Sequence, residues 1–330
     1  MRLASVLLPG ARTPEERLDG RLVVVGSDGT SGRLPDHPAC RTLRSALDQW
    51  ATAEPVLREL SSGRGGEEID LAKASFLSPL PRATDFVDGS SYLEHVRRVR
   101  RARNAEPPPD LETNPLMYRG IPTFLPPVGD IPVTDFTHGA DCEGELAVIV
   151  GDVPAGVTPA EALACVRLVT QLNDVSLREL IKRELPKQFG FLASKPPSSA
   201  GPFAVTLDEI GEAWNTGRPR LTMRIERNGE RMGELDTSEL HFSIGELIAH
   251  AAATHPLGAG TIIGTGTVSN ADQKRGVACI AESVALDTID QRPVTPYLRA
   301  GEEVTIETTL GGRSLFGRIR NRFMQAMAGR

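Results

Sequence analysis

The first 75 residues alternate short hydrophobic runs with polar turns, a pattern that predicts a small unit of its own. The runs RLASVLL at 2–8 and RLVVV at 21–25 are typical of short strands joined by a turn-rich connection. Residues 38–61 place apolar side chains near the helical period, and the SSGRGGEE that follows has the composition of a loop. We therefore expect a small α/β N-terminal domain over residues 1–75.

From residue 76 to residue 330 the hydrophobic pattern is dominated by hairpins. RLTMRIERNGERMGEL has a strand-like run on each side of Asn228-Gly229, and EEVTIETTLGGRSLFGRI turns in the same way at Gly311-Gly312. Such pairs supply the positive φ angles that tight hairpin turns need. Two proline-rich stretches exclude a helix and predict ordered connections, at 106–115 and 123–133.

Two segments of this larger unit carry the signals of helices. Residues 158–172 open with Thr158 as N-cap, Pro159 at the first helical position and Glu161 three residues after the cap. Residues 243–254 predict a second helix. Strands still outnumber helices, and hairpins outnumber alternating βαβ units, so the pattern predicts an α+β fold for the main domain.

Composition then narrows the class of protein. Of 330 residues, 40% are hydrophobic, which is enough for a sizeable core, and 37 Lys plus Arg stand against 43 Asp plus Glu, for a net charge of −6. This balance is not that of a nucleic-acid surface. No run of about 18 apolar residues exists, and the first residues lack the long apolar core of a secretory signal, so we expect a cytoplasmic protein without a membrane span.

Cysteine, glycine and histidine positions exclude several familiar sites. The four cysteines lie far apart with no CxxC pair, which argues against a zinc cluster or a disulfide framework and favours reduced thiols. The stretch GAGTIIGTGT at 258–267 lacks the strand and helix context of a nucleotide-binding loop, so we interpret it as a strand and turn that pass close to another backbone. No HExxH motif is present, and on spacing alone His95 is a residue of a helix surface.

Two glutamates stand at the start of a hydrophobic run. If CEGELAVIV at 142–150 is a strand, Glu143 and Glu145 project from one face, roughly 6.5 Å apart. Two such anions repel each other when buried, and a hard divalent cation with oxygen ligands relieves the repulsion. An exposed ladder of charges on one sheet face is the alternative, and spacing alone leaves both interpretations open.

Two further charged residues follow apolar segments. Asp174 comes directly after LVTQLN and offers a third carboxylate, although a role at a helix start is an alternative. Lys195 stands in the apolar loop FGFLASKPP, where a partly desolvated ammonium stabilises an enolate or carboxylate oxygen, or else is a simple surface charge. Neither residue decides between these roles by itself.

The order of these segments resembles the fumarylacetoacetate hydrolase family. The chain runs from DGSSYLEH through the ExE strand, NDVSLR and the SK loop to GTGT, and the similarity covers about residues 80–325. The resemblance implies a mixed β-roll or sandwich with flanking helices, a homodimer, and a divalent cation, Mg²⁺, Mn²⁺ or Ca²⁺. It also implies a small keto or diketo acid substrate and a place in the catabolism of aromatic amino acids or other aromatic compounds.

The resemblance implies metal ligands among the acids. Glu143, Glu145 and Asp174 match the three core metal carboxylates of the family. Asp88, seven residues before the histidine of the first motif, matches a fourth acid by its spacing, in preference to Asp85.

Other residues match the family's catalytic groups. His95 matches the general base that activates water, and Glu282 matches the carboxylate that orients this histidine. The remaining matches are two cations on the oxyanion and leaving-group side and two substrate contacts: Arg178 and Lys195, and Tyr118 and Thr267.

One position departs from the family pattern. The fumarylacetoacetate cleavers carry a glutamine three residues after the arginine of the NDVSLR motif, where this chain has Ile181, which cannot donate a hydrogen bond to a developing enolate. The leading hypothesis is a metal-dependent hydrolase of carbon–carbon bonds in a β-diketo acid, such as an acylpyruvate or a fumarylacetoacetate-like compound. Two alternatives stand beside it: decarboxylation, isomerisation or hydration of a 2-keto acid at the same site, and binding of a keto acid without turnover.

Overall fold

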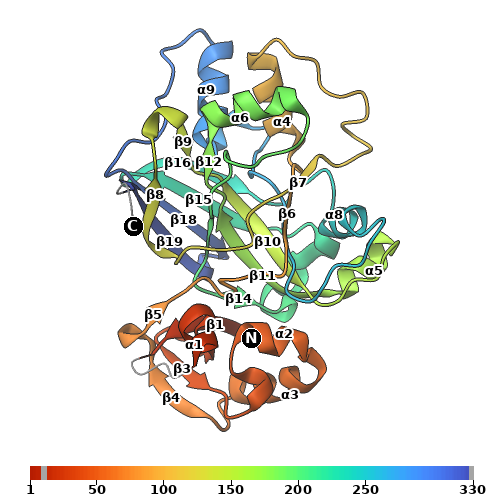
Figure 1. The fold of residues 1–330 in the computed structure, drawn as a ribbon, viewed down its shortest axis with the longest axis vertical. Coiled ribbons are helices and arrows are strands. Elements are labelled where there is room, and N and C mark those ends of the chain that lie inside the picture. Colours follow the sequence, from red (N-terminus) through yellow and green to blue (C-terminus); the bar gives the residue numbers. More distant parts are fainter. Residues whose placement is uncertain (9–12, 327–330) are drawn as a thin grey trace.

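A computed structural model describes residues 1–8 and 13–326 and confirms the α+β class. The N-terminal unit, red and orange in Figure 1, lies at one end of the molecule. Its strands are β1 (Arg2–Leu7), β2 (Arg21–Val25), β3 (Ser31–Leu34), β4 (Glu67–Asp70) and β5 (Ser75–Phe76), and its helices are α1 (Pro14–Asp19), α2 (Leu43–Asp48) and α3 (Trp50–Ser61).

The predicted turn-rich connection between the first two strands contains a helix, α1. Thr13 caps it by accepting a hydrogen bond from the Glu16 backbone, while the Glu16 side chain reaches back to the Thr13 backbone and Pro14 occupies the first position. A helix of 6 residues is too short for an apolar period to show, so only its capping box could have revealed it. Residues 9–12 of the same connection lie outside the described residues.

One long sheet joins the N-terminal unit to the main unit. In the described residues its order is β4-β3-β2-β1-β14-β11-β10-β17-β6-β7, with β5 beside β1 and β13 beside β11. Its strands in the main unit are β6 (Phe86–Gly89), β7 (Met117–Arg119), β10 (Gly144–Val150), β11 (Val166–Asn173), β13 (Ser199–Ala200), β14 (Ala204–Val205) and β17 (Ile262–Gly264). Because β1 pairs with β14, backbone hydrogen bonds connect the small unit to the sheet that carries the site.

A second sheet packs against β10 and β11 and has the order β16-β15-β18-β19-β8. Leu146 and Val148 of β10 share one buried core with Ile225 of β15 and Ile306 of β18. The strands of this sheet are β8 (Val128–Val133), β15 (Thr222–Arg227), β16 (Glu230–Asp236), β18 (Glu303–Leu310) and β19 (Arg313–Gln325), and a separate short pair joins β9 (Ala140–Asp141) to β12 (Ser176–Leu177). Both predicted hairpins are confirmed as β15–β16 and β18–β19.

Helices cover the ends and one side of the sheets. Figure 1 shows α4, α6 and α9 together at the end opposite the N-terminal unit, and α5 beside α8 at the side. The helices of the main unit are α4 (Leu93–Ala102), α5 (Pro159–Ala164), α6 (Arg178–Glu184), α7 (Leu207–Ile210), α8 (Ile244–Ala251) and α9 (Ile280–Ile289). None of the helices in the described ranges is long and apolar enough to cross a membrane.

The predicted helix over 158–172 is wrong beyond its first turns, whereas the helix predicted over 243–254 is confirmed as α8. The N-cap at Thr158 is correct, but α5 ends at Ala164 and β11 begins at Val166. The sequence VRLVTQLN is rich in β-branched and other apolar side chains, and it pairs with β10 along its whole length. Pairing in the sheet therefore outweighs the helical spacing.

The proline-rich stretch 123–133 also contains a strand. β8 pairs in parallel with β19 at the end of the second sheet. Pro132 is tolerated because an edge strand has one side without ladder partners, where a missing N–H costs no hydrogen bond.

Candidate active site

The four acids predicted to bind a metal lie buried where neighbouring strands meet. Asp88 lies on β6 and Glu145 on β10. Glu143 directly precedes β10, and Asp174 directly follows β11. β17 runs between β6 and β10, and its Gly264, which has no side chain, leaves room for carboxylates from both sides. The burial of all four acids excludes an exposed ladder of charges.

Three of these acids converge on one point. One carboxylate oxygen each of Asp88, Glu145 and Asp174 lies within 4.8 Å of the others. Both oxygens of Glu145 are buried and accept no hydrogen bond from the described residues. Burial, and then the charges of Asp88 and Asp174, raise the pKa of Glu145 well above its usual value, and burial and Asp174 raise the pKa of Asp88 to about 7. A buried, all-oxygen cluster in which both oxygens of Glu145 lack a donor among the described residues fits a hard divalent cation.

Glu143 belongs to the cationic side of the cluster. Its Oε1 accepts hydrogen bonds from Lys195 Nζ at 2.8 Å and Ser176 Oγ at 2.5 Å, and Thr267 donates to Oε2. Arg178 Nη2 lies 3.1 Å from Oε1. Although burial acts in the opposite direction, Arg178 and then Lys195 hold the pKa of Glu143 well below its usual value. Glu143 is thus the ionised partner of two cations.

Lys195 connects Glu143 to the acid cluster. Its ammonium also donates to Asp174 Oδ2 and lies 5.0 Å from the centre of the Tyr118 ring. The hydroxyls of Tyr118 and Ser198 each donate to Asp174 at 2.7 Å. Burial disfavours the ammonium, but Asp174 and then Glu143 raise the pKa of Lys195, which therefore stays charged.

A histidine–glutamate pair stands beside these carboxylates. His95 lies on α4 and Glu282 on α9, and His95 Nδ1 is 2.9 Å from Glu282 Oε2. Arg98, one turn after His95, and Ser269 donate to Glu282 Oε1 at 2.5 Å and 2.8 Å. Burial favours the neutral acid, but the bonds from His95, Arg98 and Ser269 lower the pKa of Glu282. Because an ionised carboxylate only accepts hydrogen bonds, Nδ1 carries the ring proton and Nε2 keeps a lone pair.

Asp141, which the motifs did not single out, holds Arg178 in place. The buried Asp141 accepts from Arg178 Nε at 2.8 Å and from the backbone N–H groups of Ile280 at 2.8 Å and Ala281 at 2.9 Å. These two N–H groups open α9, so Asp141 fixes the arginine relative to that helix. A signal for Asp141 exists in the sequence, because it lies two residues before the first glutamate of the ExE strand, the spacing of one strand face.

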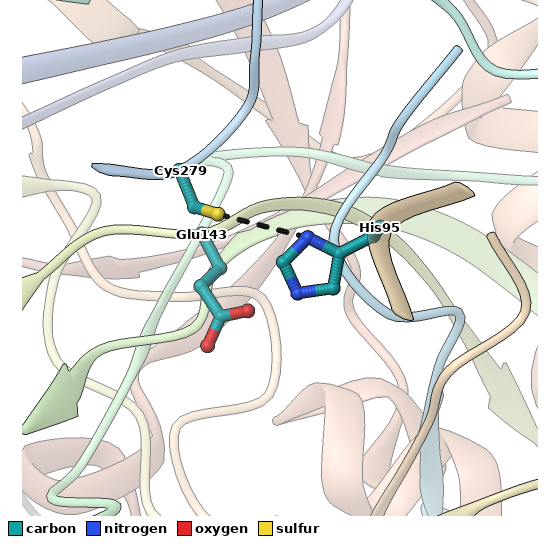
Figure 2. Close-up of side chains that lie close together, drawn as sticks. All are labelled: His95, Glu143 and Cys279. Carbon is teal, nitrogen blue, oxygen red and sulfur yellow. Dashed lines mark hydrogen bonds between the residues drawn. The ribbon is translucent and has the colours of Figure 1, made fainter. Parts of the chain in front are cut away.

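Cys279 lies beside the histidine at the N-cap of α9 (Figure 2). Its Sγ is 3.9 Å from His95 Nδ1 and accepts a hydrogen bond from the Glu282 backbone at 3.3 Å. Burial raises the pKa of the Cys279 thiol well above its usual value. The thiol is therefore protonated and not poised as a nucleophile.

A cavity of about 510 Å³ opens onto these groups. The predicted site residues that line it are Asp88, His95, Tyr118, Glu143, Glu145, Arg178, Lys195 and Thr267. Asp174 and Glu282 lie behind it as hydrogen-bond partners of Tyr118 and His95. The lining also has an apolar part, which includes Val96, Val99, Ile181, Leu185 and Phe191.

The structure therefore brings all the predicted site residues together. Asp85, the competitor for the fourth acid, lies apart from the cluster and forms an ion pair with Arg119 at 3.3 Å. Sequence reasoning missed five polar residues that hold the predicted ones: Arg98, Asp141, Ser176, Ser198 and Ser269.

Replacement of Gly264 by alanine is expected to lower the affinity for Mg²⁺ or Mn²⁺ by about tenfold to 100-fold. A Cβ at this position would lie 2.3 Å from Asp88 Oδ1 and 3.1 Å from Glu145 Oε2, inside the acid cluster. Calorimetric titration of the metal into chelator-treated protein measures the change. Gly258→Ala is the matched control, because its Cβ would meet only Thr84 Cγ2 at 3.2 Å. Equal affinities in both variants would exclude this cluster as the metal site.

Two family models match almost the whole chain. The model described as fumarylacetoacetate (FAA) hydrolase C-terminal matches residues 85–324, and the one described as fumarylacetoacetase N-terminal domain 2 matches residues 1–82. The chain belongs to the fumarylacetoacetate hydrolase family. The resemblance inferred from the motifs is confirmed, and the whole candidate site lies within the first match.

Curated relatives within the fumarylacetoacetate hydrolase family carry the names of different activities. The chain is 30% identical to oxaloacetate tautomerase YisK of Bacillus subtilis over 229 residues, 68% of this chain and 69% of that protein. It is 30% identical to 2,4-didehydro-3-deoxy-L-rhamnonate hydrolase of Sphingomonas sp. strain SKA58 over 164 residues, 48% of this chain and 54% of that one. A homoprotocatechuate catabolism bifunctional isomerase/decarboxylase of Escherichia coli is 25% identical over 226 residues, 67% of this chain and 47% of the relative.

Solved structures share the fold over the full chain. Maleylpyruvate hydrolase from Sphingobium sp. SYK-6, solved with manganese(II) ion and pyruvate, has a TM-score of 0.65 at 18% identity and covers 99% of this chain and 100% of its own. A 5-carboxymethyl-2-hydroxymuconate delta-isomerase from Mycobacterium smegmatis has a TM-score of 0.62 at 20% identity, with coverage of 98% and 100%. The family fold thus supports both hydrolases and isomerases, and the chemistry has to be argued from the site.

Proposed function

We propose that this protein is a metal-dependent hydrolase that cleaves a carbon–carbon bond of a β-diketo acid, with His95 as the base that activates water. The observation that carries this proposal is the 2.9 Å contact between His95 Nδ1 and Glu282, beside buried acids in a cavity of about 510 Å³. Relatives named maleylpyruvate hydrolase and 2,4-didehydro-3-deoxy-L-rhamnonate hydrolase support this reaction class.

The histidine–glutamate pair supplies the proton transfer. The Nε2 lone pair of His95 takes a proton from water, and the ionised Glu282 stabilises the imidazolium that results. Arg98 and Ser269 keep Glu282 ionised and in place. The same ring later returns the proton to the leaving carbon.

We assign the divalent cation to Asp88, Glu145 and Asp174, with Glu143 as the adjacent fourth acid. A bound cation supplies a Lewis acid for a keto or enolate oxygen of the substrate. The orphaned oxygens of Glu145 and the all-oxygen donor set support this assignment, and Mg²⁺, Mn²⁺ and Ca²⁺ all prefer such donors. The relative solved with manganese(II) ion and pyruvate supports a cation of this kind.

The cations on the other side offset negative charge on the substrate. Lys195 and Arg178 are buried and stay charged, so they stabilise the oxyanion and the departing enolate without reorganisation of water. We assign Tyr118 and Thr267, which line the cavity, to substrate contacts.

Ile181 favours a second candidate, in which the same site enolises a 2-keto acid without attack by water. Ile181 lines the cavity one turn after Arg178 and offers no hydrogen-bond donor for a carbanion that leaves. In this reaction the lone pair of His95 takes a proton from carbon. The 30% identical oxaloacetate tautomerase supports tautomerisation, and the isomerase/decarboxylase relative supports the other outcomes.

A substrate panel decides between these candidates. With Mg²⁺ or Mn²⁺ we expect acylpyruvates to be split into pyruvate and a carboxylic acid, and chelator to abolish the reaction, as chromatography of the products measures. Conversion of oxaloacetate with no cleavage of any β-diketo acid would establish the second candidate instead. Calorimetric binding of a keto acid with no product from any substrate would mark a binding protein without turnover.

We further propose a cytoplasmic homodimer with domains at 1–75 and 76–330 and a place in aromatic catabolism. The homoprotocatechuate catabolism relative supports that place. Light scattering on the eluting protein measures the oligomeric state, and a monomer would contradict the dimer.

A further inference from the structure

We propose that His95, Glu143 and Cys279 form a second metal site that takes Zn²⁺, and that zinc bound there inhibits the enzyme. The inhibition rests on the proposed function of His95, whereas the binding of zinc does not. Figure 2 shows the three side chains close together, with the Cys279 thiol directed at His95. One ligand atom from each lies within 4.8 Å of the other two.

The donor types separate this site from the acid cluster. Asp88, Glu145 and Asp174 offer only carboxylate oxygens, which suit hard cations. Imidazole nitrogen, carboxylate oxygen and cysteine sulfur together suit zinc, which commonly takes three protein ligands and one open position in exchangeable sites. The two neighbouring donor sets therefore select different metals, and zinc at the second set engages Glu143 but leaves Asp88, Glu145 and Asp174 for Mg²⁺.

The geometry requires only small side-chain movements. Zinc bonds of about 2.0–2.3 Å in a tetrahedron place ligand atoms roughly 3.5 Å apart. Cys279 Sγ and His95 Nδ1 are already 3.9 Å apart. The remaining donor separations, all within 4.8 Å, close by about 1 Å through rotation of side chains.

The protonated thiol of Cys279 does not prevent binding. Coordination breaks the S–H bond, forms a zinc–sulfur bond and releases the proton to solvent, with no change of oxidation state. The positive charge of zinc adds to that of Arg178 and Lys195, which contact Glu143. The carboxylates of Glu282 and Asp141, beside the same residues, offset this charge.

Zinc at this site binds His95, the residue proposed as the general base. Coordination through Nδ1 replaces the hydrogen bond to Glu282 and moves the ring proton to Nε2, so that nitrogen no longer has a lone pair for proton transfer. No CxxC pair marks the site in the sequence, because residues 95, 143 and 279 meet only through the fold.

Cobalt(II) is the probe that tests the site in the Mg²⁺-saturated full-length protein. A thiolate ligand gives cobalt(II) a near-ultraviolet charge-transfer band, and zinc displaces the cobalt. We expect this band in the wild type, with about one proton released per metal bound. Cys279→Ser should lose the band, because a serine hydroxyl is a poor ligand for zinc and cobalt. Serine is chosen because it can still cap α9, so the fold should be kept. Cys165→Ser, at the C-cap of α5, should keep the band.

Inhibition is measured on the same proteins. We expect zinc to inhibit the wild type and Cys165→Ser at concentrations at least about tenfold below those needed for Cys279→Ser. Absence of the band in the wild type, or the same band and the same zinc sensitivity in Cys279→Ser, would overturn the proposal. If no keto acid is turned over, the proposed function is wrong, but the band still shows whether zinc binds. If keto acids are turned over and the band is absent, only the proposed zinc site is wrong.

Discussion

Replacement of His95 by alanine is expected to lower kcat for cleavage of a β-diketo acid by about 100-fold to 10,000-fold, with little change in KM. The loss follows because His95 is the proposed base, with its Nδ1 held by Glu282 and its Nε2 free to accept a proton. The acid cluster lies on or next to β6, β10 and β11, whereas His95 lies on helix α4. The cluster should therefore stay intact, and the affinity for Mg²⁺ should be unchanged. Steady-state kinetics together with calorimetric titration of Mg²⁺ measure both effects.

Two further variants sharpen this result. Glu282→Gln should also lower kcat, because the amide can donate to Nδ1 and then shifts the ring proton to Nε2. His250→Ala is the matched control, since His250 is exposed on α8 and does not line the main cavity. A His95→Ala enzyme that keeps most of its hydrolytic activity would exclude His95 as the base. Loss of hydrolysis with conversion of oxaloacetate retained would favour an enolising reaction that proceeds without this base.

The residues of the candidate site were predictable because the family motifs are local in sequence. The hydrogen-bond and ion-pair partners that distinguish one acid from another were not. The ExE spacing makes Glu143 and Glu145 equivalent members of one strand face. In the structure Glu143 pairs with Lys195 and Arg178, whereas Glu145 has no hydrogen-bond partner among the described residues and faces Asp88. The difference arises from segments more than thirty residues away in the sequence, which a single-strand pattern does not contain.

The same limit explains the errors in the fold. The segment that follows α5 has apolar residues at spacings that suit a helix as well as a strand, and only its pairing with β10 decides for the strand. Asp141 likewise acquires its role from Arg178 and from the start of α9, which lie far along the chain. By contrast, Asn228-Gly229 and the Thr158 cap are local signals. The hairpin predicted from the first and the helix start predicted from the second are both confirmed.

Replacement of Glu145 by glutamine is expected to abolish tight binding of Mg²⁺ and to raise the Tm of the metal-free protein. The two oxygens of Glu145 are buried without a hydrogen-bond donor among the described residues, beside the carboxylates of Asp88 and Asp174. A neutral amide needs no bound proton to avoid repulsion in this cluster and donates to the neighbouring carboxylates, so the free-energy cost of keeping Glu145 protonated disappears. We expect a rise in Tm of about 2 °C for each kcal/mol relieved, measured in chelator by thermal unfolding, and no further rise when Mg²⁺ is added.

The size of this stabilisation should depend on pH. Because the folded-state pKa of Glu145 is raised well above its usual value and that of Asp88 is raised to about 7, the metal-free folded protein holds protons that the unfolded chain releases from about pH 4 upward. These groups therefore cost no stability near pH 4 and lower it progressively as the pH rises to about 7. The stability of Glu145→Gln relative to the wild type should grow over this range, whereas the exposed control Glu234→Gln should show no such trend. A difference that stays constant with pH would mean that Glu145 is not held in a cluster of repelling acids, and the divalent cation would lose its main physical support in this structure.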